Sequence, residues 1–498
     1  MLMRKQRRRE NTGRIRQWIG TFVLLFLAAV VAIAGYAIVR VIAYEQLDDP
    51  LHLREKQRYL SGLPKTAAQT PRPPNVVIIL FDDLGYGDLG AYGSQAIQTP
   101  SIDALAAGGA RLTSFYSAAP YCTPSRAGML TGRYPPHTGL NVINFPDRSP
   151  FTWLARLTGA ATHLPAEEIT IADALGAAGY ATALFGKWHL GHHSPARPND
   201  FGFQEFFGLH HSNDMSPLPL WHNDQIVEAD PVDQTTLTRR YTEGAVRFID
   251  QHKDRPFFVY LAHTFPHIPL HVREERRGRS DAGLYGDVVE ELDSSVGEVV
   301  RALMRNGLEH ETLVIVTSDN GPWYQGSPGS LRGRKNDVFE GGMRVPFIAS
   351  WPGRIPAGRT FDDIASGVDL LPTVLDLARL PAPPDRQLDG VSLMPLLQER
   401  GRQPHEELLF FKNGQLLAIR SGRFKYHRRQ HLFPGTQLEL PVMALIPQGP
   451  WLFDLQLDGN ESYDVSARQP GVAHRLSVAL EAREREFAAN PRGWKPVK

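Results

Sequence analysis

Residues 121–133 read YCTPSRAGMLTGR and contain the only cysteine in a chain of 498 residues. Because Cys122 has no second cysteine to pair with, it forms no disulfide within the chain, and a small buried hydrophobic residue is its ordinary alternative role. Pro124 and Ser125 suit the first turn of a helix, since proline has no N–H to lose there and serine can act as a cap. A helix N-terminus beside the guanidinium of Arg126 favours an anion. The segment therefore predicts a site for a negatively charged substrate.

A buried strand is expected before this segment. Residues 75–81 read NVVIILF, a continuous apolar run rich in β-branched residues, which is typical of a strand covered on both faces of a parallel sheet. Strands and helices then alternate, which predicts an α/β fold with a mostly parallel central sheet flanked by helices. The further strands are expected at residues 180–185, 256–262, 312–317 and 345–350, and helices at residues 102–109, 170–179 and 285–304.

Polar side chains follow the carboxyl ends of several expected strands. In open α/β sheets, ligands bind beyond these ends. Adjacent carboxylates such as Asp82 and Asp83 are costly there unless a cation neutralises them. A solvated turn is the alternative for each residue taken singly, but the recurrence at strand ends predicts one shared site. The residues concerned are Asp82, Asp83, Lys187, His189, His267, Asp319 and Asn320, with Lys335 following later.

The pattern of apolar and turn residues changes near residue 380. Residues 381–498 contain short apolar runs separated by turn residues such as Ser421-Gly422, followed by a helical pattern. We therefore expect a catalytic domain at residues 74–380 and a smaller C-terminal subdomain at 381–498, built from an antiparallel sheet and one helix. The expected strands are residues 408–411, 416–420, 424–427 and 451–454, and the helix is residues 471–489.

The N-terminus combines a basic tail with an apolar run. Residues 1–17 are rich in arginine, and residues 18–39 are roughly long enough to span a bilayer as a transmembrane helix. The basic tail on one side and acidic residues on the other place residues 1–17 in the cytoplasm. The catalytic domain is then expected in a bacterial periplasm or outside the cell, joined to the membrane anchor by a linker at residues 40–73.

Two other interpretations of the N-terminus stay open. Ala32-Ile33-Ala34 offers a small-x-small cleavage site, so residues 18–39 could belong to a signal peptide that is removed. The arginine cluster could also be a twin-arginine export signal. We favour the uncleaved anchor because the apolar run continues beyond the cleavage site.

Composition narrows the classes of protein. There are 54 lysines and arginines against 53 aspartates and glutamates, so the net charge of +1 gives no general attraction to nucleic acid. A single cysteine argues against a secreted protein stapled by disulfides but not against a bacterial periplasm. No pattern in the sequence predicts an oligomeric state.

The motif Cys122-x-Pro124-x-Arg126, continued by residues 127–132, resembles the signature of type I sulfatases in the alkaline phosphatase superfamily. The segments DNGPW at 319–323 and FEGGMR at 339–344 look most like the arylsulfatase A group. The resemblance implies that a formylglycine-generating maturation enzyme oxidises Cys122 to formylglycine, whose hydrate is the nucleophile. It also implies hydrolysis of an aryl or carbohydrate sulfate monoester, from a sulfated small molecule or glycan, to an alcohol and inorganic sulfate.

The same resemblance implies roles for the residues at the strand ends. A calcium ion would be held by oxygen ligands of the kind that a hard cation prefers. Arg126 would stabilise the hydrate, and His189 would act as a base when sulfate is released. His267 and Lys335 would assist the leaving oxygen. The implied metal set is Asp82, Asp83, Cys122, Asp319 and Asn320; the catalytic set is Cys122, Arg126, Lys187, His189, His267 and Lys335; the substrate-binding set is Lys187, Ser212, His267 and Lys335.

Two other functions remain as alternatives at this point. A phosphatase or phosphodiesterase of the same superfamily would usually carry serine or threonine as its nucleophile, so Cys122 disfavours it. A non-catalytic, membrane-tethered binder of sulfated glycans would keep the pocket but leave Cys122 unmodified.

Overall fold

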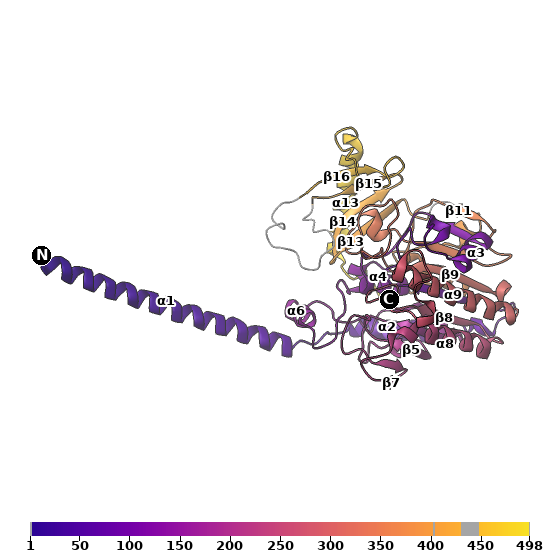
Figure 1. Ribbon diagram of the computed structural model, residues 1–498, viewed down its shortest axis with the longest axis horizontal. Helices are drawn as coiled ribbons and strands as arrows, with labels where there is room; N and C mark the ends of the chain where they lie inside the picture. Colours follow the sequence, from indigo (N-terminus) through magenta and orange to yellow (C-terminus); the bar gives the residue numbers. More distant parts are fainter. Residues whose placement is uncertain (1, 402–403, 430–447, 498) are drawn as a thin grey trace. The chain divides into compact units, whose positions relative to one another are not determined.

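In the computed structural model, the apolar run at residues 75–81 forms β1 (Asn75–Phe81), an inner strand of a ten-stranded sheet. It pairs in parallel with β8 (Phe257–Ala262) on one side and β9 (Thr312–Ser318) on the other, and both of these neighbours are labelled in Figure 1. All residues of β1 are buried, because one hydrophobic core contacts Val76, Ile78 and Leu80 and another contacts the alternate residues. The expectation of a strand covered on both faces is confirmed.

The structure describes residues 2–401, 404–429 and 448–497, with the backbone alone for residues 2–17. Met1 and the side chains of the basic tail lie outside the described residues. The chain forms two compact units: one comprises Met1–Leu47 and Asp147–Ala160, and the other comprises Asp48–Pro146 and Ala161–Lys498.

The sheet is parallel at its centre and mixed toward its edges. β4 (Ala181–Lys187) runs parallel to β8, and β5 (Glu205–Leu209) runs parallel to β4. Beyond β9, β10 (Phe347–Ser350) is antiparallel to both β9 and β2 (Ala110–Leu112). The mostly parallel α/β fold is therefore confirmed. The remaining strands of this sheet are β6 (Leu220–His222), antiparallel to β5, β7 (Gln225–Glu228), antiparallel to β6, and the edge strand β11 (Arg359–Phe361), which pairs in parallel with β2. Separately, β3 (Phe115–Tyr116) pairs with β12 (Ala365–Ser366).

Helices cover both faces of the sheet. Apolar residues of one group of helices join the core that contains Val76, and those of the other group join the core that contains Val77. The first group comprises α2 (Pro50–Gly62), α4 (Cys122–Thr131), α7 (Ile171–Ala177), α11 (Leu370–Leu377) and α12 (Met394–Leu397), and the second comprises α3 (Pro100–Gly108), α8 (Leu237–His252) and α9 (Gly283–Arg305).

The C-terminal part forms the expected antiparallel sheet with one helix. Its apolar residues share a core with Tyr116 and Val368, so this part packs on the rest of its unit. The strands occur in the order β13 (Glu407–Lys412), β14 (Gln415–Ser421), β15 (Phe424–His427) and β16 (Trp451–Asp454), and α13 (Pro470–Ala489) contacts β14 and β15.

The prediction of a linker at residues 40–73 is wrong for part of that range. Helix α2 forms there, capped by Asp49, and its buried residues pack into the larger unit. His52 Nδ1 lies 2.9 Å from Asp385 Oδ2, and Lys56 Nζ donates to the Glu168 carbonyl at 2.7 Å. The segment reads as polar because most of its buried residues are polar, and the partners of His52 and Lys56 lie far away in the sequence.

The smaller unit consists of α1 (Leu2–Ile42) and α6 (Pro150–Thr158) with their adjoining residues. Residues Trp18–Ile42 are long and apolar enough to cross a membrane, as the anchor hypothesis requires, and a signal sequence would meet the same criterion.

A buried ionic network joins the C-terminal sheet to α10 (Glu340–Met343). Lys425 Nζ lies 3.0 Å from Glu340 Oε1 and 3.2 Å from Glu461 Oε1, with all three side chains fully buried. Burial alone would raise the pKa of Glu340, but Lys425 and nearby arginines hold it at about 2. The network therefore keeps the Glu340 carboxylate ionised inside the protein.

Replacing Lys425 with methionine is expected to lower the free energy of unfolding by about 3–5 kcal/mol at neutral pH, because both carboxylates lose their buried partner. Folding lowers the pKa of Glu340 from 4.5 to about 2, so its stabilising contribution is full above pH 4.5 and is lost as the pH falls through about 2. The difference between variant and parent should shrink over that range. Urea unfolding at several pH values measures it, with Lys253→Met on the surface as the control; equal stability of Lys425→Met and parent at neutral pH would contradict the expectation.

Candidate active site

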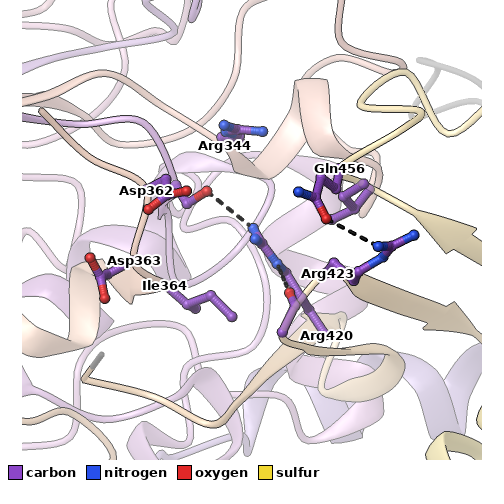
Figure 2. A pocket seen from close by; sticks show the side chains of 10 residues that line it. Arg344, Asp362, Asp363, Ile364, Arg420, Arg423 and Gln456 are labelled. Carbon is purple, nitrogen blue, oxygen red and sulfur yellow. Dashed lines mark hydrogen bonds between the residues drawn. The ribbon is translucent and has the colours of Figure 1, made fainter. Parts of the chain in front are cut away.

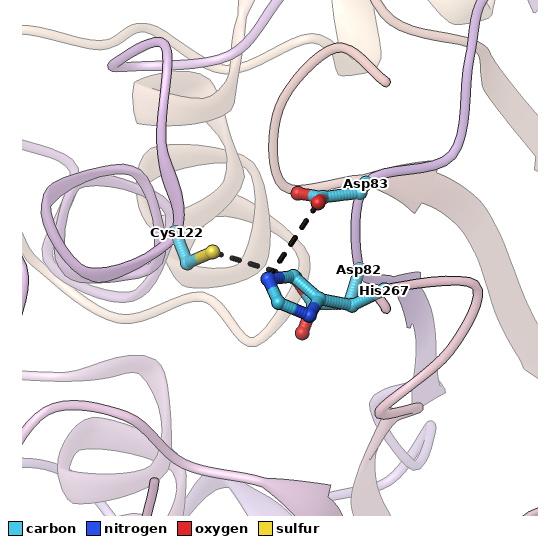
Figure 3. Close-up of side chains that lie close together, drawn as sticks. All are labelled: Asp82, Asp83, Cys122 and His267. Atoms are coloured by element: carbon cyan, nitrogen blue, oxygen red, sulfur yellow. Dashed lines mark hydrogen bonds and ion pairs between the residues drawn. The ribbon is translucent and has the colours of Figure 1, made fainter. Parts of the chain in front are cut away.

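The predicted site residues converge at the carboxyl ends of neighbouring strands. Asp82 and Asp83 follow β1, Lys187 ends β4, and Asp319 follows β9. Because β9, β1, β8 and β4 are consecutive in the sheet, their ends meet at one edge. Figure 3 shows the centre of this cluster, where ligand atoms of Asp82, Asp83, Cys122 and His267 all lie within 4.8 Å of one another. All the predicted site residues are buried.

Cys122 is the first residue of α4, as the sequence predicts. Its Sγ lies 3.4 Å from Asp82 Oδ1. Burial, together with the negative charge of Asp82, raises the pKa of the Cys122 thiol far above its usual value. An unmodified thiol would therefore stay protonated and would be a weak nucleophile here. Ser125 does not cap the helix; its hydroxyl donates instead to the Asp319 carbonyl at 2.5 Å.

Asp82 lies among cations. Lys187 Nζ is 2.5 Å from Asp82 Oδ2, and Arg126 Nη2 is 3.6 Å from the same oxygen. Burial opposes ionisation of Asp82, but Lys187, His267 and Arg126 together hold its pKa well below the usual range. Lys187 Nζ also donates to Ser212 Oγ at 3.1 Å, which brings the expected sulfate-contacting serine into the cluster.

Asp83 organises the opposite side of the cluster. Lys335 Nζ lies 2.8 Å from Asp83 Oδ1, and His267 Nε2 lies 3.6 Å from Asp83 Oδ2. Burial alone would lower the pKa of Lys335, but Asp83 and other negative neighbours raise it well above its usual value, so the ammonium stays charged. Asp83 has φ of 66°, a left-handed conformation that is strained for a residue other than glycine and typical of functional sites.

The donor set fits a hard cation such as calcium. Burial and the nearby charge of Asp82 raise the pKa of Asp319 to about 7, despite a contact of 2.8 Å between Arg126 Nε and Asp319 Oδ2. Asn320 Oδ1 is buried and has no hydrogen-bond partner, while Asn320 Nδ2 donates to Asp83 Oδ1 at 2.7 Å. A cation bound by these oxygens would relieve the carboxylate repulsion and satisfy the orphaned amide oxygen.

His189 is held with one ring nitrogen free. Its Nε2 lies 2.9 Å from the carbonyl oxygen of Asn144. Because a carbonyl oxygen can only accept a hydrogen bond, the proton of the neutral ring is assigned to Nε2. Nδ1 is buried without a hydrogen-bond partner. Burial and the charge of Lys187 keep the pKa of His189 well below its usual value. Its φ of 63° is a second strained backbone conformation among the predicted residues.

Asn213 orients His267. His267 Nδ1 lies 3.1 Å from Asn213 Oδ1 and 2.5 Å from the Ile268 carbonyl, so two oxygen acceptors fix a proton on Nδ1 and turn Nε2 toward Asp83. Burial and the positive charge of Lys335 lower the pKa of His267. Asn213 Nδ2 in turn donates to the Pro269 carbonyl at 3.0 Å.

Sequence reasoning missed Asn144 and Asn213 as parts of the site. Asn213 directly follows Ser212, and this position next to a predicted site residue is the one feature of the sequence that could have pointed to it. Asn144 acts through its backbone carbonyl, which carries no residue-specific signal. By contrast, all the predicted residues from Asp82 to Lys335 lie in or against the cluster, and His189 is linked to it by the charges of Lys187 and Arg126.

A separate hollow of about 340 Å³ lies outside this cluster, and its lining includes arginines and acidic residues (Figure 2). The arginines are already engaged: Arg344 with Glu340, Arg420 with the Ser114 hydroxyl, and Arg423 with Asp454. We therefore do not assign an anion site to it.

The fold and the cluster together are typical of a hydrolase for an anionic ester: buried oxygen ligands and positively charged side chains surround the first residue of a helix, at the carboxyl ends of parallel strands. Residues 74–380 match the sulfatase family over most of the chain. The chain belongs to the sulfatase family, and as a sulfuric ester hydrolase it hydrolyses sulfate esters.

Individual relatives support this assignment. The chain is 39% identical over 391 residues to N-acetylgalactosamine-6-sulfatase of Mus musculus, covering 74% of each chain. It is 37% identical over 455 residues to arylsulfatase A of Homo sapiens, covering 82% of this chain and 87% of that one. Among solved structures, PsFucS1 sulfatase from Pseudoalteromonas sp. has 28% identity and a TM-score of 0.75, covering 90% of this chain and 96% of that one. The similarity to Ps i-CgsB in complex with k-i-k-neocarrahexaose is 29% identity with a TM-score of 0.70, covering 84% and 94%.

Proposed function

We propose that this sulfatase removes sulfate from carbohydrate sulfate monoesters. The observation that carries the proposal is the convergence of Lys187, Ser212 and Lys335 beside Cys122 and the acidic cluster. These groups offer charge and hydrogen bonds to a sulfate group. The carbohydrate part is supported by two relatives, one named for N-acetylgalactosamine and one whose structure holds a neocarrahexaose.

We further propose that Asp82, Asp83, Asp319 and Asn320, with the modified Cys122, hold calcium. Calcium supplies positive charge against the sulfate oxygens, and formylglycine at position 122 supplies the nucleophilic hydroxyl. Around that centre, Arg126 holds Asp319 in place and keeps positive charge close to position 122. Lys187 and Ser212, already within 3.1 Å of each other, would bind sulfate oxygens from one side.

We assign His189 to one step of the reaction, and Lys335 and His267 to another. His189 presents an unprotonated Nδ1 at neutral pH, which suits a base that removes a proton during sulfate release. Lys335 remains charged and so can stabilise negative charge on the leaving alcohol oxygen. His267 turns Nε2 toward Asp83, near Lys335, and we assign it to the same oxygen, to which it would donate once Nε2 carries a proton.

Assays of sulfate release from a panel of sulfate esters test the proposal. Turnover should occur with sulfated N-acetylgalactosamine or galactan oligosaccharides and be much weaker with steroid sulfates. A phosphate monoester of the same sugar is the control for the phosphatase alternative. Release of phosphate but not of sulfate would refute the proposed function, and turnover of steroid sulfate alone would refute the carbohydrate assignment.

Removing the Asn213 side chain is expected to lower kcat about tenfold, in the range seen when a supporting hydrogen bond to a site histidine is lost. Asn213→Ala leaves the Ile268 carbonyl as the remaining acceptor for His267 Nδ1 and so holds the ring less firmly, and the pH profile of kcat should therefore shift. Asn199→Ala, an exposed asparagine, is the matched control. An unchanged pH profile in Asn213→Ala would show that His267 needs no such support.

We also propose that residues 18–39 anchor the protein, with the catalytic part outside the cytoplasm. The length of the apolar helix Trp18–Ile42 supports this, as does the basic sequence before it. We keep residues 74–380 as the catalytic domain and 381–498 as a subdomain packed within the same compact unit. N-terminal sequencing of membrane-extracted protein should find the full tail; a mature N-terminus at Gly35 would show a cleaved signal peptide instead.

A further inference from the structure

Helix α6 exposes large apolar side chains that the sulfatase site does not use. The nine-residue helix starts after Ser149, whose side chain accepts a hydrogen bond from the Phe151 N–H, and ends at Thr158, with Gly159 as its C-cap. Trp153 is 55% exposed and Leu154 is 56% exposed. Leaving two such side chains in water on one turn is unfavourable, so this surface indicates a contact that the isolated chain does not make.

Polar contacts hold α6 beside the C-terminal end of α1, within the same compact unit (Figure 1). Arg40 Nη2 donates to the Leu157 carbonyl at 3.5 Å. Tyr44 donates its hydroxyl to the Ala160 carbonyl at 2.8 Å. The last turn of α6 and the residues after it are therefore attached to the point where the apolar helix ends.

The length of the apolar helix sets the level of these contacts relative to a bilayer. Residues Trp18–Ile42 number 25 and rise about 37 Å at 1.5 Å per residue. The hydrocarbon core of a bilayer is only about 30 Å thick. Tyr44 is also a residue type enriched at the membrane–water interface, and a long side chain such as that of Arg40 near a helix end can extend its charge to that interface. When α1 spans a bilayer, α6 is thus held at the level of the lipid head groups.

We propose that α6 is a second membrane contact: an interfacial helix that inserts Trp153 and Leu154 among the lipids of the leaflet from which α1 emerges. Exposed tryptophan and leucine at adjacent positions of a short helix suit such a position. The proposal rests on α1 being an uncleaved anchor. It has a consequence for the enzyme, because α6 lies in the chain between Cys122 and β4. The larger unit would be tied to the membrane through both ends of α6 as well as through the segment after α1.

Site-specific quenching in vesicles tests this proposal with the full chain. Cys122 is the sole cysteine and is buried, so an introduced surface cysteine can be labelled selectively. Trp153→Cys carries a bimane label in vesicles of phosphatidylethanolamine and phosphatidylglycerol that contain nitroxide-labelled lipid. Val478→Cys, on an exposed valine of α13, is the matched reference. Lipid nitroxide should quench the label at position 153 severalfold more strongly than the label at 478, and aqueous iodide should show the reverse order.

A second measurement separates lipid contact from chance exposure of one label. A label on Thr158→Cys should also be quenched by lipid nitroxide, and that quenching should fall severalfold when Trp153→Ser and Leu154→Ser are added. Turnover of a soluble substrate by this combined variant should equal that of the parent, which shows that it is folded. Iodide quenching at 153 as strong as at 478, or energy transfer between labels on two copies without lipid quenching, would overturn the proposal. Resistance of the protein to alkaline extraction reports separately on α1, so a failed anchor and a failed α6 contact are distinguishable.

Discussion

Replacing Cys122 with serine is expected to abolish sulfate release, with a loss of at least about 10⁴-fold in kcat, as for removal of other catalytic nucleophiles. A serine hydroxyl can attack sulfur once, but its carbon carries no second hydroxyl whose proton a base could remove to expel the sulfate. We therefore expect turnover to require the aldehyde oxidation state, which the cysteine at position 122 would supply after maturation. Stopped assays with a chromogenic aryl sulfate measure the effect.

The Cys122→Ser variant should remain folded, because serine is nearly the same size as the buried cysteine. Thr131→Ser, a change of one methyl group at the other end of α4, is the matched control and should keep its activity. Normal steady-state turnover by Cys122→Ser would show that position 122 does not need the aldehyde and would favour the phosphatase-like alternative.

Removal of the metal is expected to cost both activity and stability. Asp82, Asp83 and Asp319 bring three carboxylates into one buried place, and without a cation the raised pKa of Asp319 shows the resulting strain on its charged form. Saturating calcium at about 100 times its Kd would stabilise the folded protein by about 3 kcal/mol, since it binds only that form. Chelation should therefore lower the melting temperature and stop turnover, and added calcium should restore both.

Asp319→Ala should lose most of the activity and bind calcium more weakly, whereas Asp250→Ala, an aspartate on the surface of α8, should change neither. Metal content, melting temperature and kcat of both variants give the comparison. Full activity in a metal-free preparation would refute the metal assignment. Recovery with a transition metal but not with calcium would keep the site and refute the choice of ion.

The sequence predicted the centre of the fold because that centre has the strongest patterns. Strand β1 forms at residues 75–81 as expected, since a continuous β-branched run is stable only where both faces are covered. Polar residues at strand ends then located the cluster, because parallel strands bring such ends to one edge. Asp83 and His189 in left-handed conformations were not predictable, as each depends on the surrounding structure to hold it there.

Other features depend on partners far away in the sequence. Helix α2 was interpreted as linker because His52 and Lys56 read as exposed, yet their partners Asp385 and Glu168 bury them. Strand β2, three residues long, carries too short a pattern to be recognised before β10 pairs with it. The carbonyl of Asn144 that fixes the His189 ring is a backbone atom, and any residue at that position could supply it.

The most direct test of the central claim is the mass of the tryptic peptide that spans residues 112–126, taken from enzyme of measured activity. Protein made with and without a formylglycine-generating enzyme should contain different fractions of aldehyde at position 122. We predict that kcat per molecule rises in proportion to the aldehyde fraction and extrapolates to zero where only the thiol is present. Fully active protein whose peptide carries only an unmodified Cys122 thiol would contradict the account.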